Sequence, residues 1–97
     1  MRYLYLAIHH PKPDRVDDLV RAMTQFGDTL VSLPGMLQAS AWRDEGSIVA
    51  LSVWRSRDDF VAARPAIAAA IANVPFDEWE ERPRELFGLD ELAGVSQ

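Results

Sequence analysis

The sequence lacks cysteine altogether. Disulfide bonds, zinc sites built on thiolates and catalytic thiols are therefore excluded. Histidine is scarce as well, because the chain contains only the neighbouring residues His9 and His10. Successive side chains of a strand point to opposite faces of a sheet, so these two imidazoles do not bind one metal ion together. With no third ligand evident, we expect no metal site.

Positive charge is also in short supply. The 97-residue chain has ten Lys and Arg against fifteen Asp and Glu, for a net charge of −5. Neutralisation of phosphates supplies most of the affinity of nucleic-acid-binding proteins, so an acidic chain without a basic stripe argues against that class and against anionic lipid surfaces. No apolar run is long enough to cross a bilayer or to form the core of a signal peptide, and we expect a cytoplasmic protein.

Four segments have the composition of strands. Residues 2–9 and 47–55 are apolar at both alternating sets of positions, which predicts strands buried on both faces. Residues 36–43 mix polar with apolar side chains, and residues 84–89 carry charge and follow a proline, as edge strands do. The turn at residues 44–46 joins the second and third segments in a predicted hairpin.

Two helical segments separate these strands. Residues 16–31 carry apolar side chains at i, i+3, i+4 and i+7 spacing, with Asp14 as the predicted N-cap. Ser56 opens a second helix with a capping motif. Pro65 falls inside this helix and would cost about 3 kcal/mol there, so we expect a break at that position.

The order β-α-β-β-α-β predicts an α+β, ferredoxin-like fold with a four-stranded antiparallel sheet in the order 4-1-3-2. We expect residues 1–93 to form one domain and residues 94–97 to be a frayed tail. Two helices cover only one face of such a sheet. Covering the apolar side chains of the other face would yield on the order of 10 kcal/mol per subunit. Two sheets packed together would gain roughly twice that, against a cost of about 4–15 kcal/mol for association. A homodimer through the sheet face is therefore predicted.

One stretch of the sequence also carries a family resemblance. Residues 49–60 read Val-Ala-Leu-Ser-Val-Trp-Arg-Ser-Arg-Asp-Asp-Phe, an apolar strand that ends in an aromatic residue and runs into a Ser-capped helix. Residues 33–36 form a helix–Pro-Gly–strand junction. In both features the chain resembles the antibiotic-biosynthesis-monooxygenase-like (ABM) domains of the dimeric α/β-barrel superfamily, over roughly residues 2–90.

The resemblance implies a cofactor-independent monooxygenase acting on a small aromatic phenol or quinol. The alternative is a non-catalytic small-molecule-binding or structural homodimer of the same fold. The haem-degrading branch of the family has an Asn on its first strand and a Trp and a His on its second helix. These places fall near Ala7, Ala63 and Asn73 here, none of which fits, so haem degradation is disfavoured.

A candidate site follows from side chains that share a strand face. His9 is the candidate catalytic base, since imidazole accepts a proton near neutral pH; its alternative is a strand-end residue that contacts solvent or the following loop. Arg64 either binds an anionic oxygen of the substrate or pairs with Asp58 or Glu78. The acidic residues 78–81 are expected to be solvated surface. The predicted substrate-binding residues, which have a purely structural core as their alternative, are Tyr3, Tyr5, Trp42, Trp54, Phe60 and Arg64.

Overall fold

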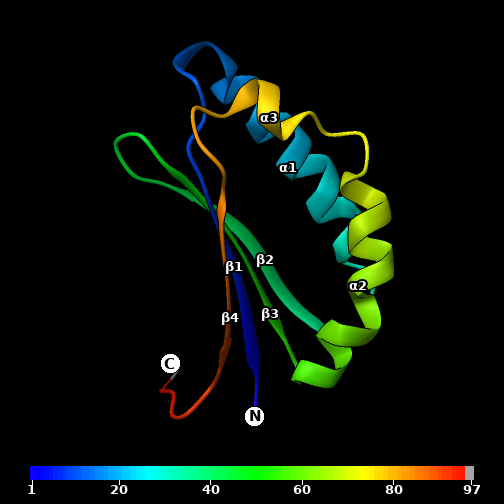
Figure 1. Cartoon of the computed structure of the whole chain (residues 1–97). Helices are drawn as coiled ribbons and strands as arrows, with labels where there is room; N and C mark the ends of the chain where they lie inside the picture. The colour runs from blue at the N-terminus through cyan, green and yellow to red at the C-terminus, as the bar shows by residue number, and fades with distance from the viewer. Residues whose placement is uncertain (96–97) are drawn as a thin grey trace.

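The computed structural model describes residues 1–95, which form a four-stranded antiparallel sheet with helices on one side (Figure 1). The strand order β2-β3-β1-β4 is the predicted order read from the other edge, so the ferredoxin-like α+β fold is confirmed. Within the described residues, no helix combines the length and apolarity needed to cross a bilayer. The elements are β1 (Tyr3–His9), a 3₁₀ turn (Pro13–Arg15), α1 (Val16–Leu30), β2 (Met36–Arg43), β3 (Ile48–Trp54), α2 (Arg57–Ile71), α3 (Phe76–Trp79) and β4 (Glu85–Asp90).

The two strands that are apolar on both faces occupy the centre of the sheet. In β1 and β3, Tyr3 pairs with Trp54 and His9 pairs with Ile48. All four of these side chains are buried, which identifies the odd positions of β1 and the even positions of β3 as the face that meets the helices. The sequence alone leaves this choice open, because both faces of each central strand are apolar.

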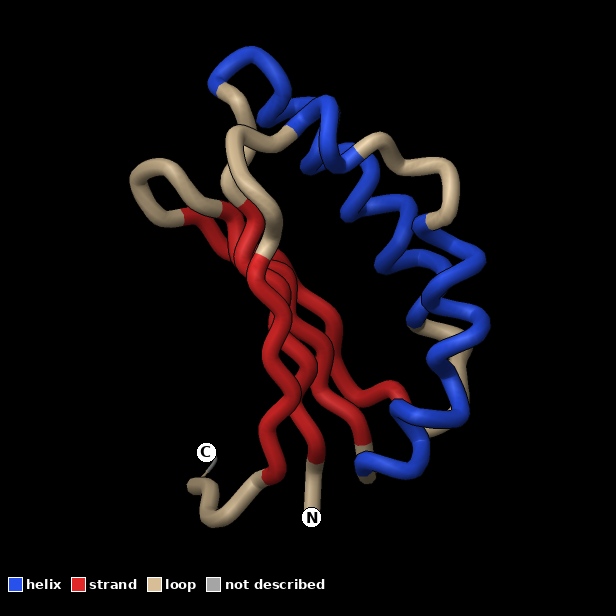
Figure 2. Tube along the Cα trace, viewed as in Figure 1, coloured by secondary structure: helices blue, strands red, loops and turns tan. Residues whose placement is uncertain are grey.

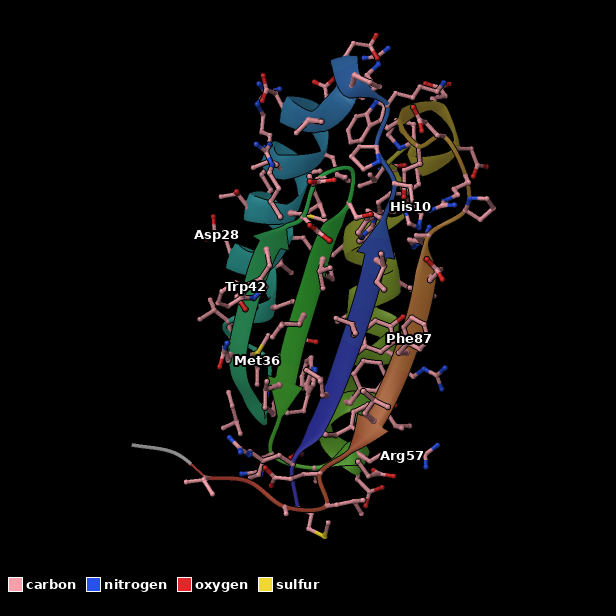
Figure 3. The ribbon with its side chains drawn as sticks, turned by 90° about the vertical axis from the view of Figure 1, so that its left-hand side faces the viewer. His10, Asp28, Met36, Trp42, Arg57 and Phe87 are labelled. Atoms are coloured by element: carbon pink, nitrogen blue, oxygen red, sulfur yellow. The ribbon has the colours of Figure 1, made fainter. Side chains whose placement is uncertain are left out.

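The opposite face of the sheet has no helix over it (Figure 2). Trp42 on β2 and Phe87 on β4 lie on this open face, with 59% and 42% of their surface exposed (Figure 3). The central strands contribute apolar side chains between them that are only partly buried in the single chain: Leu4, Leu6, Ile8, Val49, Leu51 and Val53.

The two long helices begin in different ways. Ser56 caps α2 as predicted, since its hydroxyl accepts a 3.1 Å hydrogen bond from the backbone N–H of Asp59. The prediction of Asp14 as the cap of α1 is wrong. Pro13 opens a 3₁₀ turn that runs directly into α1, so Asp14 lies inside that turn and Arg15 occupies the cap position without a side-chain hydrogen bond.

The predicted break at Pro65 is also wrong, because α2 runs without interruption from Arg57 to Ile71. Proline removes the hydrogen bond to the carbonyl four residues earlier, which belongs to Val61. Pro65 is exposed and the side chain of Val61 is 45% exposed, so the freed carbonyl lies on the solvent side of α2 and water can satisfy it.

Two glycines fit positions that a side chain could not occupy. Gly35 ends the turn between α1 and β2 with a φ of 81°, in the left-handed region. A Cβ at Gly88 of β4 would collide with the Tyr3 hydroxyl, so this glycine lets the Tyr3 ring lie across the edge strand. Of the predicted tail 94–97, residues 94 and 95 have no regular secondary structure, and the last two lie outside the described residues.

Candidate functional site

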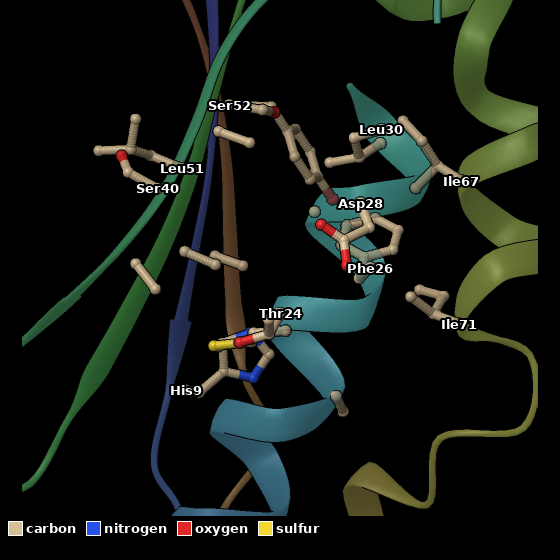
Figure 4. Close-up of a pocket in the computed structure, with 18 of the residues that line it drawn as sticks. His9, Thr24, Phe26, Asp28, Leu30, Ser40, Leu51, Ser52, Ile67 and Ile71 are labelled. Carbon is tan, nitrogen blue, oxygen red and sulfur yellow. The ribbon is translucent and has the colours of Figure 1, made fainter. Parts of the chain in front are cut away.

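A cavity of about 630 Å³ lies between the helix face of the sheet and the inner sides of α1 and α2 (Figure 4). This volume is within the range of small-molecule sites. Most of its lining is apolar. Its polar residues come from the sheet, including His9 and Ser52, from α1, which contributes Thr24 and Asp28, and from Arg84 just before β4. The lining side chains that define it best are Tyr5, Ala7, His9, Ser52, Phe26, Leu30, Ile67, Ile71, Phe76 and Arg84.

His9 is the last residue of β1, and its titratable side chain points into this cavity. Only 4% of its surface is exposed. Its Nδ1 lies 3.2 Å from Oε2 of Glu80, a residue 71 positions further along the chain. The ring packs against Phe76 with the two ring centroids 5.5 Å apart. A carboxylate therefore orients the imidazole, and an aromatic ring restricts its rotation.

The backbone around α3 holds Glu80 in this position. The N–H of Glu80 donates a 2.9 Å hydrogen bond to the carbonyl of Phe76, which closes the single turn of α3. Glu80 also forms an isolated β-bridge with Pro11, just after β1. Its second carboxylate oxygen, Oε1, accepts a 3.0 Å hydrogen bond from the backbone N–H of His10. Both oxygens of this buried carboxylate are thus used.

The environment of His9 favours the neutral imidazole. Burial lowers the pKa of His9 below its usual value of 6.5, the hydrogen bond to Glu80 opposes that shift, and the positive charge of Arg84 adds to it. A carboxylate accepts but does not donate, so Nδ1 carries the proton and Nε2 is left as an acceptor. Within residues 1–95, Nε2 of His9 has no hydrogen-bond partner. Every fully buried side-chain nitrogen or oxygen in this part of the chain has a partner, so Nε2 is not fully buried. Because His9 lines the cavity, Nε2 opens into it.

The structure divides the predicted substrate-binding residues between two places. Tyr5 lines the cavity. Tyr3, Trp54 and Phe60 lie together in the closed hydrophobic core at the end of the sheet away from His9. The Phe60 ring joins the two groups, because its centroid is 4.6 Å from that of Tyr5 and 5.1 Å from that of Tyr3.

Trp42 and Arg64 lie outside the cavity. Trp42 belongs to the open face, where its indole N–H donates a 2.9 Å hydrogen bond to the hydroxyl of Ser40, and Figure 4 shows Ser40 directed away from the cavity. Arg64 lies on the exposed side of α2 with its guanidinium 6.0 Å from the Phe60 ring centroid. In the described part of the chain it forms no ion pair with Asp58 or Glu78, the two predicted partners.

Two residues of the cavity end were not predicted from the sequence. Glu80 was expected to be solvated surface together with its acidic neighbours, and this is wrong because only 7% of it is exposed. Arg84 falls in the predicted last strand, where the sequence pattern gives it no role. The prolines and the Trp79 that flank Glu80 were a usable signal, since such residues in an acidic stretch indicate chain packed against the domain.

The second histidine belongs to a separate cluster. Nε2 of His10 lies 2.8 Å from the carboxylate of Glu85, and its Nδ1 contacts Ser47 and Arg82. His9 and His10 thus point in different directions, as the strand geometry predicts. Among the residues described, no group of three or more His, Asp or Glu side chains is placed to hold a metal ion.

Comparison with known proteins gives one consistent result. The model of the family "antibiotic biosynthesis monooxygenase" matches residues 1–70. The solved structure of Rv0793 from Mycobacterium tuberculosis has 21% identity and a TM-score of 0.83, covering 99% of this chain and 100% of that one. SnoaB from Streptomyces nogalater, a cofactor-independent oxygenase solved as a mutant, has 13% identity and a TM-score of 0.80, covering 99% and 98% of the two chains.

A third similar structure has a different activity. The heme-degrader MhuD from Mycobacterium tuberculosis, solved with two hemes bound in its active site, has 17% identity and a TM-score of 0.73, covering 97% of this chain and 99% of that one. No curated protein sequence matches the chain. At these identities the structural likeness establishes the fold alone.

Proposed function

Because the chain belongs to the antibiotic biosynthesis monooxygenase family, we propose that it is a cofactor-independent monooxygenase acting on a small aromatic phenol or quinol. The observation that carries this proposal is the buried His9–Glu80 pair, whose free Nε2 opens into an apolar cavity. The likeness in fold to SnoaB, a cofactor-independent oxygenase, supports it.

His9 has the properties of a general base for a phenol. Its lowered pKa keeps the imidazole neutral at physiological pH, so Nε2 is available to accept the phenolic proton. Glu80 holds the required tautomer and stabilises the imidazolium that forms, as a buried carboxylate does for a catalytic histidine in general. The apolar walls of the cavity and the ring of Tyr5 contact the flat aromatic part of the substrate.

The oxidation needs no reductant beyond the substrate. Once His9 has taken the phenolic proton, the anion transfers one electron to dioxygen, and the resulting radical pair combines into a carbon–oxygen bond. The imidazolium protonates the peroxide. His9 then removes the hydrogen from the same carbon, the oxygen–oxygen bond breaks, and a carbonyl and water form. One naphthol and one dioxygen thus give one quinone and one water.

Oxygen uptake tests this proposal directly. Naphthols and anthrones are incubated with the purified protein without added cofactor, and oxygen consumption is recorded together with quinone formation. We expect equal amounts of oxygen consumed and quinone formed for at least one phenol, and no uptake for its methyl ether, which has no phenolic proton. Binding of the phenols without uptake would favour the alternative function, a non-catalytic ligand-binding dimer.

Replacing Glu80 with glutamine is expected to change the pH dependence of the reaction. Glu80 raises the pKa of His9 against the effect of burial, so removing its charge lowers that pKa further. We expect the acidic limb of kcat/KM, which reports the free enzyme, to lie below the usual imidazole pKa in the wild type and to move to still lower pH in Glu80→Gln. The plateau should fall about tenfold or more, because an amide no longer enforces one imidazole tautomer.

The measurement is kcat/KM as a function of pH for the best phenol of the panel. Glu78→Gln is the matched control, since Glu78 also lies near the end of the cavity but is exposed and does not contact His9. An acidic limb that stays in place or moves to higher pH in Glu80→Gln would contradict the role given to this carboxylate.

We also propose that the protein works as a homodimer through the open face of the sheet. The apolar side chains of that face, including Leu6 and Leu51, have no covering element in the single chain. Burying each stabilises the assembly by about 1.5–3 kcal/mol. The His9 cavity lies on the other side of the same sheet, so each subunit would carry its own site.

A further inference from the structure

Arg84 is a cation at the end of the cavity next to His9. It lies just before β4 and lines both the main cavity and a smaller recess formed by α3 and the segment before it. Its guanidinium carbon is 4.3 Å from the centroid of the Phe76 ring, which also packs against His9. An aromatic ring therefore holds this side chain in place, half-buried, beside the candidate base.

The charge of Arg84 has no carboxylate partner within residues 1–95. Asp77 and Glu78 line the outer recess with it, but neither lies within ion-pair distance. Glu80, the buried carboxylate nearest the cavity, has both oxygens occupied by His9 and His10. A guanidinium carries five N–H donors, and two of them can donate parallel hydrogen bonds to the two oxygens of a carboxylate, so this side chain suits an anionic ligand.

The field of this cation reaches the reacting end of the cavity. Of the charged groups around His9, Arg84 and His10 lower the pKa of its imidazole, and Glu80 raises it. An anion bound to Arg84 would thus change the pKa of His9. A ligand that places an acid group at Arg84 also brings its ring into the apolar part of the cavity.

We propose that Arg84 is the anion-recognising residue of the site and that the ligand is an aromatic phenol bearing a carboxylate. This inference rests on the proposed function, because it uses the same cavity and the same base. The carboxylate pairs with the guanidinium, and the phenolic hydroxyl meets Nε2 of His9. Since both protein groups pack against Phe76, the acid and the hydroxyl belong on the same ring or on two fused rings.

A pair of ligands that differ only in charge tests the inference. 1-Hydroxy-2-naphthoate and 1-hydroxy-2-naphthamide are titrated by calorimetry into the wild type and Arg84→Gln at pH 7.5. We expect the wild type to bind the acid about tenfold or more tightly than the amide, as for hydrogen bonds between charged groups. Arg84→Gln should lose this preference while binding the amide as before. Equal affinity for the two ligands in the wild type, or binding of neither, would overturn the inference.

A matched control and a second measurement separate recognition from folding. Arg57→Gln also removes an arginine beside an aromatic ring, here 6.0 Å from the Tyr3 centroid and outside the cavity, and it should keep the preference for the acid. NMR titration of His9 should give a higher pKa in Arg84→Gln, because a neighbouring positive charge is removed. An unchanged pKa would mean that the Arg84 charge does not face the cavity.

The two proposals fail in different ways. Oxygen uptake with neutral phenols but no preference for the acid would support the proposed monooxygenase activity and overturn the proposed anion site. A preference for the acid that depends on Arg84, without oxygen uptake for any phenol, would support an anion site in a binding protein and overturn the proposed monooxygenase activity.

Discussion

Replacing His9 with alanine is expected to lower kcat/KM for phenol oxygenation by about 10²- to 10⁴-fold, the contribution typical of a positioned general base. The residue that replaces it cannot accept a proton, and within residues 1–95 no other imidazole lines the cavity. Glu80 does not substitute for it, because both of its oxygens are used in fixing β1 to the segment after α3. Truncation also leaves this buried carboxylate without one of its two partners.

The pH dependence distinguishes a lost base from a distorted cavity. A free phenol has a pKa of about 10, so at high pH the substrate arrives already deprotonated. The rate of His9→Ala should therefore approach that of the wild type as the pH approaches the pKa of the substrate. A defect that stays constant with pH would indicate lost binding, and the proposal that His9 is the base would then be wrong.

His10→Ala is the matched control for this experiment. Its imidazole contacts Glu85 and Ser47 and does not line the cavity. Only its backbone N–H contacts Glu80, and this group remains in the variant. We expect activity close to that of the wild type, once thermal unfolding has shown that the variant is folded. Full activity in His9→Ala, at neutral pH, would place the base elsewhere.

The fold could be predicted because short stretches of the sequence are enough to identify its strands and helices. Residues 2–9 and 47–55 have apolar side chains on both faces, and only central strands of a sheet need that. Proline and glycine mark the ends of the helices, and Ser56 forms the predicted cap. The error at Pro65 arose because sequence does not reveal that its side of α2 faces water.

The candidate site was harder to predict because it depends on contacts between distant segments. The His9–Glu80 hydrogen bond joins residues separated by 71 positions, and no local periodicity encodes such a contact. The location of Trp42 depends on an irregularity in β2 between Met36 and Gln38. Simple alternation from Met36, which faces the helices, would turn Trp42 toward the helices as well. The one-residue shift in register turns it to the open face.

The substitution Leu51→Glu on the open face is expected to convert a wild-type homodimer into a folded monomer. Leu51 pairs directly with Leu6 of β1 in the middle of the open face. Its side chain points away from the cavity in Figure 4, so the single chain exposes the new carboxylate to water at little cost. In a two-fold symmetric dimer the substitution occurs twice, and each unpaired carboxylate would be buried in an apolar interface.

Sedimentation equilibrium at about 10 μM, far above the nanomolar Kd that a favourable interface of this kind can reach, measures the outcome. Val61→Glu is the matched control, because it places the same charge on an apolar residue that is 45% exposed on the outside of α2. The wild type and Val61→Glu should be dimers and Leu51→Glu a monomer, with circular dichroism showing that all three are folded. A monomeric wild type would refute the dimer.

The same variant shows whether the cavity depends on the partner subunit. The groups that define the site, from His9 on β1 to Arg84 before β4, lie on the helix side of the sheet, away from the open face. A folded Leu51→Glu monomer should therefore keep its affinity for a phenol within a few fold. Loss of binding in that monomer, with the fold intact, would mean that the packing of one sheet on another holds the strands in the curvature that the cavity requires.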